Sequence, residues 1–281
     1  SEMCIRDSVG ASNQLSIETE AELQIPNSDF ETWSEKFVWK GTGKPGSIDI
    51  YTFYPYEDSD LDPWWSTQND LTTAKAGIYS YYYVAYPGTT YVNSSWSAST
   101  RMKLSTSPIN GSYSAEIATI GWGEGSTCTT GLPWGGLSCN KKTSSTLYIG
   151  KYDISTGEVH GHTFASRPTQ MTFNYRFYSY NGEAASASIQ IEHREGDNIV
   201  NLGNGYMNLS TTNTDKATLN ISYSNEELQP THISIVFLSS TSSSPAIKEY
   251  SGEINTWSGN ADTRGIGNVL VIDDVHLEYA K

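Results

Sequence analysis

Hydrophobic and polar residues alternate with a period of two in several segments of the second half of the chain. The clearest runs from Met171 to Phe177, where four large apolar or aromatic side chains are separated by Thr, Asn and Arg, and a second runs from Ala187 to Ile191. A period of two places alternate side chains on opposite faces of a strand, so both segments predict half-buried β-strands. The pattern recurs in three further segments, which are residues 217–223, 233–237 and 269–279.

Turn-forming residues separate these segments, and a convincing helical pattern is missing. Only Ser224–Leu228 offers a helix cap followed by acidic residues, enough for one turn before Pro230. Many short strands joined by Gly, Asn, Ser and Pro clusters are typical of sandwiches and jelly rolls, and no repeat of 20 to 50 residues indicates a propeller or solenoid. We therefore predict an all-β fold, an antiparallel β-sandwich jelly roll with very little helix.

The chain divides into three parts by composition. Residues 1–8 share no pattern with the rest of the chain and are similar to a translated sequencing adapter, so we expect a non-native leader. Residues 9–24 contain several Glu and no aromatic residue, which indicates a solvated linker. Residues 25–281 are then expected to form a single domain.

Composition and charge exclude several classes of protein. An aromatic content of 12% in 281 residues is too high for a disordered chain. The net charge of -14, from 17 basic and 31 acidic residues, would repel a phosphate backbone, so nucleic acid is not an expected partner. No apolar stretch approaches the roughly 18 to 20 residues that a membrane span requires.

Two of the three cysteines lie close together in a glycine-rich segment. Cys128 and Cys139 fall within residues 121–145, a stretch too long for a simple hairpin and therefore a candidate binding loop. In an oxidising compartment the pair is expected to form a disulfide, whereas a zinc site would need two further ligands that the neighbouring sequence does not supply.

Two terminal motifs resemble a known family. They are the segment Ile25–Trp33, which reads IPNSDFETW, and the segment Gly267–Tyr279, which reads GNVLVIDDVHLEY. Together with intervening motifs such as Asp62–Asn69 and Leu147–Gly150 in the same order, they resemble the carbohydrate metabolism domain family known as PCMD. The resemblance implies a galactose-binding-like jelly roll of the carbohydrate-binding-module type, on exported proteins of glycan-scavenging bacteria, at the cell surface or in the periplasm. It also implies that an immunoglobulin-like domain can precede this one in the full-length protein.

The same resemblance implies a structural calcium ion. In carbohydrate-binding jelly rolls, a similar Phe-Glu opening and a similar closing Asp-Asp-Val strand lie side by side and share the cation, which prefers six to eight oxygen ligands. The matching residues here are Asp29, Glu31, Asp273 and Asp274. The alternative is that Asp29 caps a turn and the two aspartates bond to backbone groups or basic residues. Strand alternation would then point at most one of the aspartates inward.

Exposed tryptophans are the candidate sugar platforms. Sugar rings stack on indoles, and their hydroxyls need amide, carboxylate or guanidinium partners. Core packing stays open as an alternative, because a domain of this size needs large core side chains and adjacent Trp residues on a strand point in opposite directions. The candidate ligand-binding residues are Trp64, Trp65, Asn69, Arg101, Trp122 and Trp134.

Catalytic patterns are weaker than binding patterns. Glycoside hydrolases need two carboxylates about 5 to 9.5 Å apart, and no pair among the 31 acidic residues has diagnostic spacing. The chain has no Gly-x-Ser-x-Gly elbow and no dinucleotide-binding motif, so no organic cofactor is implied. His160 and His162 are expected on a solvent-facing hairpin.

The leading hypothesis is a non-catalytic module of an exported protein that binds an oligo- or polysaccharide through Trp stacking and polar contacts. The alternatives are a glycoside hydrolase that uses a carboxylate pair and an adhesive module whose partner is a protein.

Overall fold

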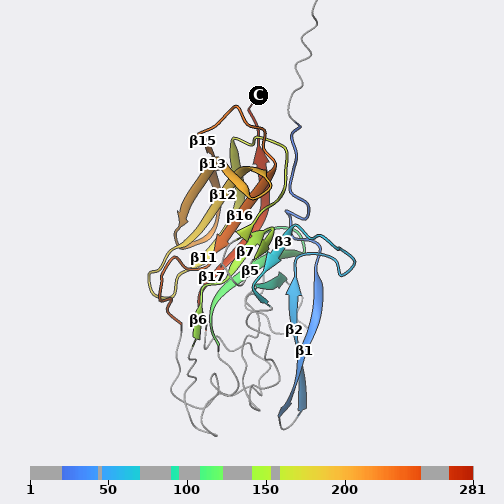
Figure 1. The fold of residues 1–281 in the computed structure, drawn as a ribbon. Coiled ribbons are helices and arrows are strands. Elements are labelled where there is room, and N and C mark those ends of the chain that lie inside the picture. Colours follow the sequence, from blue (N-terminus) through green and yellow to red (C-terminus); the bar gives the residue numbers. More distant parts are fainter. Residues whose placement is uncertain are drawn as a thin grey trace, which may run out of the picture.

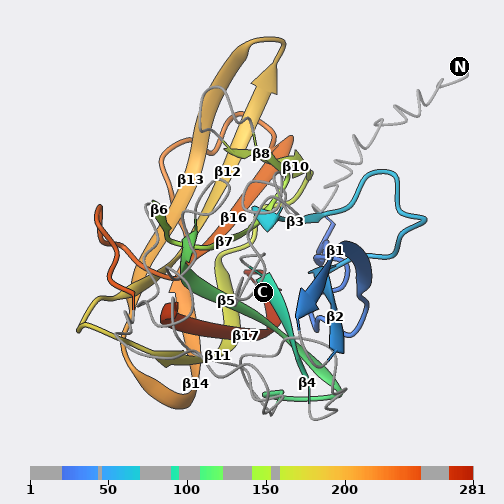
Figure 2. The same ribbon diagram turned by 90° about the horizontal axis from the view of Figure 1, so that it is seen from below.

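The computed structural model describes residues 21–43, 46–69, 90–94, 108–122, 141–152, 159–247 and 266–280. These residues form two antiparallel β-sheets packed face to face, with two short two-stranded ribbons beside them (Figures 1 and 2). Within the described ranges, no helix has the length and hydropathy that a membrane span requires.

The first sheet has the strand order β15-β13-β12-β16-β7-β3, and β10 also pairs with β16. Its strands are β3 (Trp65–Thr67), β7 (Thr146–Ile149), β10 (His162–Thr163), β12 (Ala185–Glu195), β13 (Asn198–Leu209), β15 (Ser222–Tyr223) and β16 (His232–Leu238).

The second sheet has the strand order β14-β11-β17-β5-β4, and β6 also pairs with β5. Its strands are β4 (Thr90–Ser94), β5 (Tyr113–Trp122), β6 (Lys141–Thr143), β11 (Gln170–Tyr178), β14 (Thr212–Asn220) and β17 (Ile266–Glu278).

The remaining strands form the two small ribbons. In the first, β1 (Ser34–Gly43) pairs with β2 (Gly46–Tyr54), and Figure 1 shows this ribbon extending alongside the sandwich. In the second, β8 (Lys151–Tyr152) pairs with β9 (Val159–His160).

The core lies between the two sheets and contains the apolar residues that the period of two selects. Met171 and Phe173 on β11 face Ile189 and Ile191 on β12, and all four are buried. The rings of Phe173 and Phe237 meet edge to face across the sandwich, with centroids 5.1 Å apart. The half-buried strands predicted from these residues are therefore confirmed.

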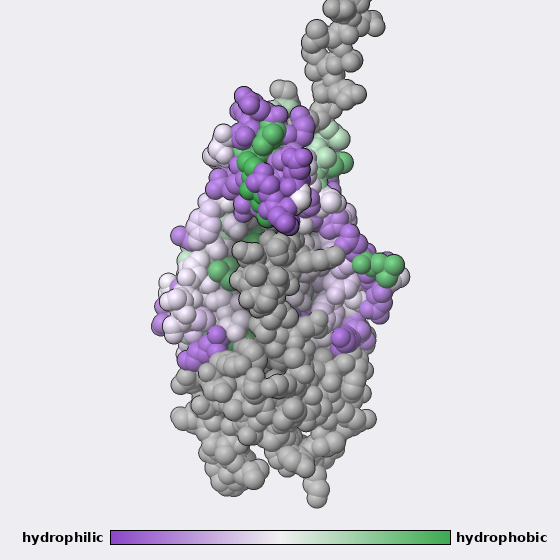
Figure 3. All heavy atoms as spheres, viewed as in Figure 1, coloured by the Kyte–Doolittle hydropathy of each residue, from purple (hydrophilic) through white to green (hydrophobic). Residues whose placement is uncertain are grey.

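The chain passes repeatedly between the sheets, as it does in a jelly roll. β11 belongs to the second sheet, β12 and β13 to the first, β14 to the second, β16 to the first and β17 to the second. All described pairings are antiparallel, and the predicted fold class, an antiparallel β-sandwich jelly roll, is confirmed. On the face shown in Figure 3, the described surface is mostly hydrophilic, with small separate apolar patches.

The last strand contains an irregularity that a simple alternation does not predict. The register of β17 against β11 shifts between His276 and Asp273, and Asp274 has a φ of 49°. Such a β-bulge exchanges the face on which the following residues lie. Leu270 and Ile272 before the bulge and Val275 and Leu277 after it belong to the sandwich core, so the core side of the strand changes from even- to odd-numbered residues. Val271 is also buried, as the alternation predicts, but lies outside this core cluster.

Both ends of the described chain lie side by side. The backbone N–H of Val275 donates to the carbonyl of Ser28 at 2.9 Å, and the Gln24 side chain exchanges two hydrogen bonds with the backbone of Leu277. The backbone carbonyl of Leu23 accepts a hydrogen bond from Tyr279. Contacts with the sandwich thus begin before Ile25, the residue at which the sequence places the start of the domain.

Candidate functional site

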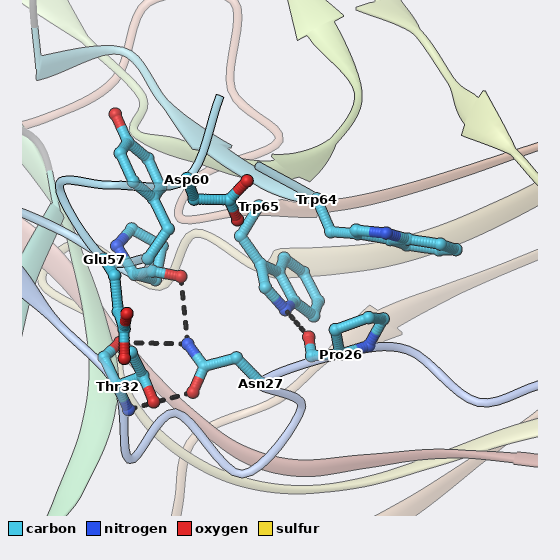
Figure 4. A pocket seen from close by; sticks show the side chains of 9 residues that line it. Pro26, Asn27, Thr32, Glu57, Asp60, Trp64 and Trp65 are labelled. Atoms are coloured by element: carbon cyan, nitrogen blue, oxygen red, sulfur yellow. Dashed lines mark hydrogen bonds between the residues drawn. The ribbon is translucent and has the colours of Figure 1, made fainter. Parts of the chain in front are cut away.

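A pocket of about 250 Å³ lies between the turn that follows Ile25 and the loop that joins β2 to β3. The β1–β2 ribbon separates these two segments along the chain, and β3 joins the loop to the first sheet through β7. Figure 4 shows Trp64 and Pro26 on one side of the pocket and Glu57 and Thr32 on the other. The lining residues are Pro26, Asn27, Thr32, Pro55, Tyr56, Glu57, Asp60, Trp64 and Trp65.

Asn27 holds the two segments together at the base of the pocket. Its amide nitrogen donates to the carbonyls of Thr32 at 3.0 Å and Pro55 at 2.9 Å, and its amide oxygen accepts from the N–H of Thr32 at 2.9 Å. Its φ of 47° lies in the left-handed region, which Asn tolerates better than most residues. Because these bonds use the polar atoms of the side chain, Asn27 builds the pocket rather than offering a ligand contact.

Trp65 belongs to the core. Only 1% of its surface is exposed, its ring packs against Phe30 at a centroid distance of 4.9 Å, and its indole N–H donates to the carbonyl of Pro26 at 3.1 Å. An indole enclosed in this way has no free face for a sugar ring. The prediction that Trp65 is a stacking platform is therefore corrected to core packing, for the reason that adjacent strand residues point in opposite directions.

Trp64 is half-buried at the rim of the pocket. Its ring stacks on His162, with centroids 4.1 Å apart and planes 19° apart, and Phe164 meets its edge at 6.4 Å. Its backbone carbonyl accepts a hydrogen bond from the N–H of Gly150 at 3.0 Å, which fixes the residue at the start of β3. Trp64 and Trp65 both line the pocket, and of these two described platforms Trp64 is the half-buried one with part of its side chain accessible.

His162 does not lie on a solvent-facing hairpin, as the sequence suggested. Its side chain is 14% exposed, because one ring face is covered by Trp64, and its Nε2 atom lies 3.4 Å from a carboxylate oxygen of Asp62. Gly161 allows the chain to pass close to β16 just before His162, since a Cβ atom at Gly161 would lie 2.3 Å from the carbonyl oxygen of Ile233. The sequence signal was the His-Gly-His pattern, but alternation alone does not reveal an aromatic neighbour nearly 100 residues away.

Asn69 is also structural. It is fully buried, and its side-chain amide donates to the carbonyl of Phe53 at 2.7 Å while its backbone N–H donates to Thr67 Oγ1 at 3.2 Å. A sugar hydroxyl cannot reach an amide at this depth, so the prediction that Asn69 binds ligand hydroxyls is corrected. Its role is to fasten the end of β3 to β2.

The acidic side chains of the pocket were not predicted from the sequence. Glu57 and Asp60 are exposed and line it, and each accepts a hydrogen bond from a neutral donor in the same loop, from the Ser59 hydroxyl at 3.4 Å and the Asp62 N–H at 3.0 Å. The available signal was the run Tyr56–Asp62, which reads YEDSDLD and directly precedes the Trp pair.

The four residues proposed for calcium lie around the junction of the two chain ends. The Glu31 carboxylate accepts from the N–H groups of Ser112 at 2.8 Å and Tyr113 at 3.2 Å. A Cβ atom at Gly111 would collide with this carboxylate, and the φ of Gly111 is +56°. Asp29 is exposed and accepts a long 3.5 Å hydrogen bond from the N–H of Glu31.

Asp273 is the buried member of this group, at 1% exposure. Its two carboxylate oxygens accept from the Ser114 hydroxyl at 2.7 Å, the Asn110 N–H at 3.0 Å and the Asp274 N–H at 2.9 Å. Burial raises the pKa of Asp273 to about 6, and these hydrogen bonds counteract part of that effect.

Asp274 is the fourth member of this group, and its carboxylate contacts two asparagine side chains. One of its carboxylate oxygens accepts from the side-chain amides of Asn110 and, at 2.9 Å, Asn174. The carboxylates of Glu31, Asp273 and Asp274 therefore face amide and hydroxyl donors, and among the described residues no three His, Cys, Asp or Glu side chains are arranged to hold a metal ion. This donor set does not fit a preformed cation cage, and calcium stays a prediction from the resemblance.

The other proposed site residues lie outside the described ranges. They are Arg101, Trp134, Cys128 and Cys139, while Trp122 is described only as the last backbone position of β5. Their roles in ligand binding and disulfide formation stay predictions.

Comparisons with known proteins give structural likenesses alone. No protein-family model and no curated protein matches the chain, so the PCMD resemblance stays a prediction. The carbohydrate-binding module TmCBM61 in complex with β-1,4-galactotriose has 9% sequence identity and a TM-score of 0.27, covering 61% of this chain and 74% of that one.

Two further solved structures are also carbohydrate-binding modules. CBM28, a module specific for non-crystalline cellulose, has 11% identity and a TM-score of 0.30, covering 64% of this chain and 81% of that one. A module of the β-sandwich superfamily with promiscuous specificity has 11% identity and a TM-score of 0.32, covering 88% of this chain and 75% of that one.

Proposed function

We propose that this domain binds a glycan without cleaving it, in the pocket bordered by Trp64. The observation that carries the proposal is the Trp64 indole, which is held in place by His162 and Phe164 at the rim of a 250 Å³ pocket that also contains carboxylate oxygens. An aromatic face beside hydrogen-bond acceptors matches a sugar ring, which has apolar C–H faces and hydroxyls around its edge.

The contacts on Trp64 explain why this indole suits ligand binding. His162 covers one face of the ring and Phe164 meets its edge, so the side chain has little rotamer freedom left to lose when a ligand arrives. The face opposite His162 is the one on which a pyranose would stack. Burying that face contributes about 0.5–1.5 kcal/mol beyond the area term, by analogy with aromatic pairs.

The polar part of the pocket comes from Glu57 and Asp60. One oxygen of each carboxylate is engaged within the loop, which leaves the other able to accept a hydrogen bond from a sugar hydroxyl. Hydrogen bonds with an ionised partner are about twice as strong as neutral ones. The pocket is smaller than the roughly 300–1,000 Å³ of sites that enclose drug-sized ligands, which suits one or two rings of a longer chain.

The proposal is tested by glycan-array screening of the purified domain, followed by calorimetry with each soluble hit. Trp64→Ala is expected to weaken binding at least tenfold, whereas Tyr178→Ala, which truncates an exposed aromatic on β11 of the other sheet, leaves affinity unchanged. Each hit is also incubated with the domain and analysed for released sugars. Release that is lost on removing one carboxylate would replace this proposal with a glycoside hydrolase.

Export to the cell surface or periplasm belongs to the same proposal, since a glycan-scavenging role requires contact with external polysaccharide. Trp122, Trp134 and Arg101 are proposed to extend the binding surface beyond the pocket. Truncating Trp122 or Trp134 to Ala in the same array assay is expected to lower affinity for long glycans more than for short ones.

A further inference from the structure

The charged side chains that line the pocket are all negative among the described residues. Of the nine lining residues in the described part of the chain, two are acidic, namely Glu57 and Asp60, and the others are apolar or neutral, so no Lys, Arg or His is among them. Asp58 and Asp62 lie in the same exposed loop and add to its negative charge.

These charges are not neutralised within the described part of the protein. Glu57 and Asp60 accept hydrogen bonds only from a hydroxyl and a backbone N–H, and neither forms an ion pair among the described contacts. Asp62 differs, because its carboxylate lies 3.4 Å from His162 Nε2. The overall charge of -14 adds a background of the same sign.

We propose that the pocket selects glycans by charge, binding those with protonated amino sugars most tightly, neutral sugars less tightly and uronic acid sugars least. This inference rests on the proposed function, since it concerns the ligand class of the same pocket. Two charges about 5 Å apart at a solvent-exposed site attract or repel enough to change affinity severalfold for each carboxylate. The two carboxylates together are therefore expected to separate amino from neutral sugars by about tenfold.

Three glycans of equal length provide the test, namely a chitosan tetramer, a chitin tetramer and a galacturonic acid tetramer. The chitosan and chitin tetramers share one backbone and differ at the nitrogen, which carries a neutral acetamide in chitin and a protonated amine in chitosan. Calorimetry is done at pH 5.5, so that the amines of the chitosan tetramer carry protons. It is repeated at 20 mM and 300 mM NaCl, because screening acts on the charge term alone.

Variants separate the local charge from the background charge. Glu57→Gln and Asp60→Asn are each expected to reduce the affinity ratio of chitosan to chitin about threefold, with a smaller effect at high salt. Asp197→Asn changes the net charge equally in the exposed turn between β12 and β13, and is expected to leave the ratio unchanged.

The outcomes distinguish this inference from the function on which it rests. Equal affinity for the three tetramers, tightest binding of the galacturonic acid tetramer, or an equal effect of Asp197→Asn and Glu57→Gln would overturn charge selection while leaving glycan binding in place. Binding of all three that does not respond to Trp64→Ala would overturn the placement of the site. Failure of every glycan in the array and of all three tetramers would overturn both.

Discussion

Replacing Asp273 with Asn is expected to remove a pH dependence from the stability of the fold. Asp273 is 1% exposed in the bulge of β17, and burial raises its pKa from 3.8 to about 6. In the unfolded chain the carboxyl group titrates near its ordinary value. At a pH between these two pKa values, Asp273 keeps its proton in the native protein and has lost it in the unfolded chain.

The sign and size of the effect follow from this difference. A folded-state pKa above the unfolded value favours the native state at low pH, and the contribution is lost as pH rises toward 6. The shift of about 2 units, at about 1.36 kcal/mol per unit, is only partly expressed above pH 4, and it predicts that the free energy of unfolding falls by about 2 kcal/mol between pH 4 and pH 6.5. For a chain of this size, that corresponds to roughly 4–8 °C in Tm.

Urea titrations at half-unit steps from pH 3.5 to 7 measure this dependence. The difference between the wild-type and Asp273→Asn profiles isolates the residue, because every other carboxylate is common to both proteins. The variant also changes the hydrogen bonds to Ser114 and Asn110, so a constant difference in unfolding free energy between the two proteins is expected. The test is therefore how the unfolding free energy changes with pH. Parallel profiles, or a wild-type stability that rises relative to the variant between pH 4 and 6, would refute the reasoning.

Three further predictions concern residues around the pocket and the bulge. Trp65→Ala is expected to lower the free energy of unfolding by about 3–5 kcal/mol because it empties a core position, and Trp64→Ala is expected to lower it by less than half as much. Urea unfolding of both variants checks this. Equal losses of stability would contradict the core assignment of Trp65. His162→Ala is expected to weaken glycan binding about threefold to tenfold, since the Trp64 ring loses the side chain that stacks on it, while circular dichroism shows an unchanged fold. An unchanged affinity would show that the stacking of His162 on Trp64 does not contribute to binding. Chelation tests calcium: an unchanged Tm in EDTA is expected from the hydrogen-bonded carboxylates, whereas a lower Tm that added calcium restores would establish the ion.

The strand content and much of the core could be predicted from the sequence. The alternation over Met171–Phe177 and Ala187–Ile191 is regular, and it selects side chains that meet across the two sheets. Local periodicity is enough for this purpose because the odd-numbered side chains of Met171–Phe177 all stay buried, although the register of β11 shifts within this segment against both β14 and β17. On β17 the same reasoning found the strand but missed the change of its core side, because the bulge at Asp273 and Asp274 shifts the register.

The candidate site was only partly predictable, for reasons of long-range geometry. The sequence identified the Trp64–Trp65 pair but could not decide which indole faces the core, since that depends on the register of β3 against β7. Asn69 has an amide side chain of the kind that binds sugar hydroxyls, but this side chain is fully buried, and its burial cannot be read from the sequence. His162 stacks on Trp64 because β10 pairs with β16, and local sequence patterns do not reveal this long-range pairing.

The most direct test of glycan binding at the pocket is a nuclear magnetic resonance titration of the indole N–H groups with the tightest array hit. The Trp64 resonance, assigned with Trp64→Phe, is expected to shift progressively with glycan concentration, while the Trp65 N–H, buried and bonded to the Pro26 carbonyl, stays nearly unchanged. A saturating titration that leaves the Trp64 resonance in place would contradict the account.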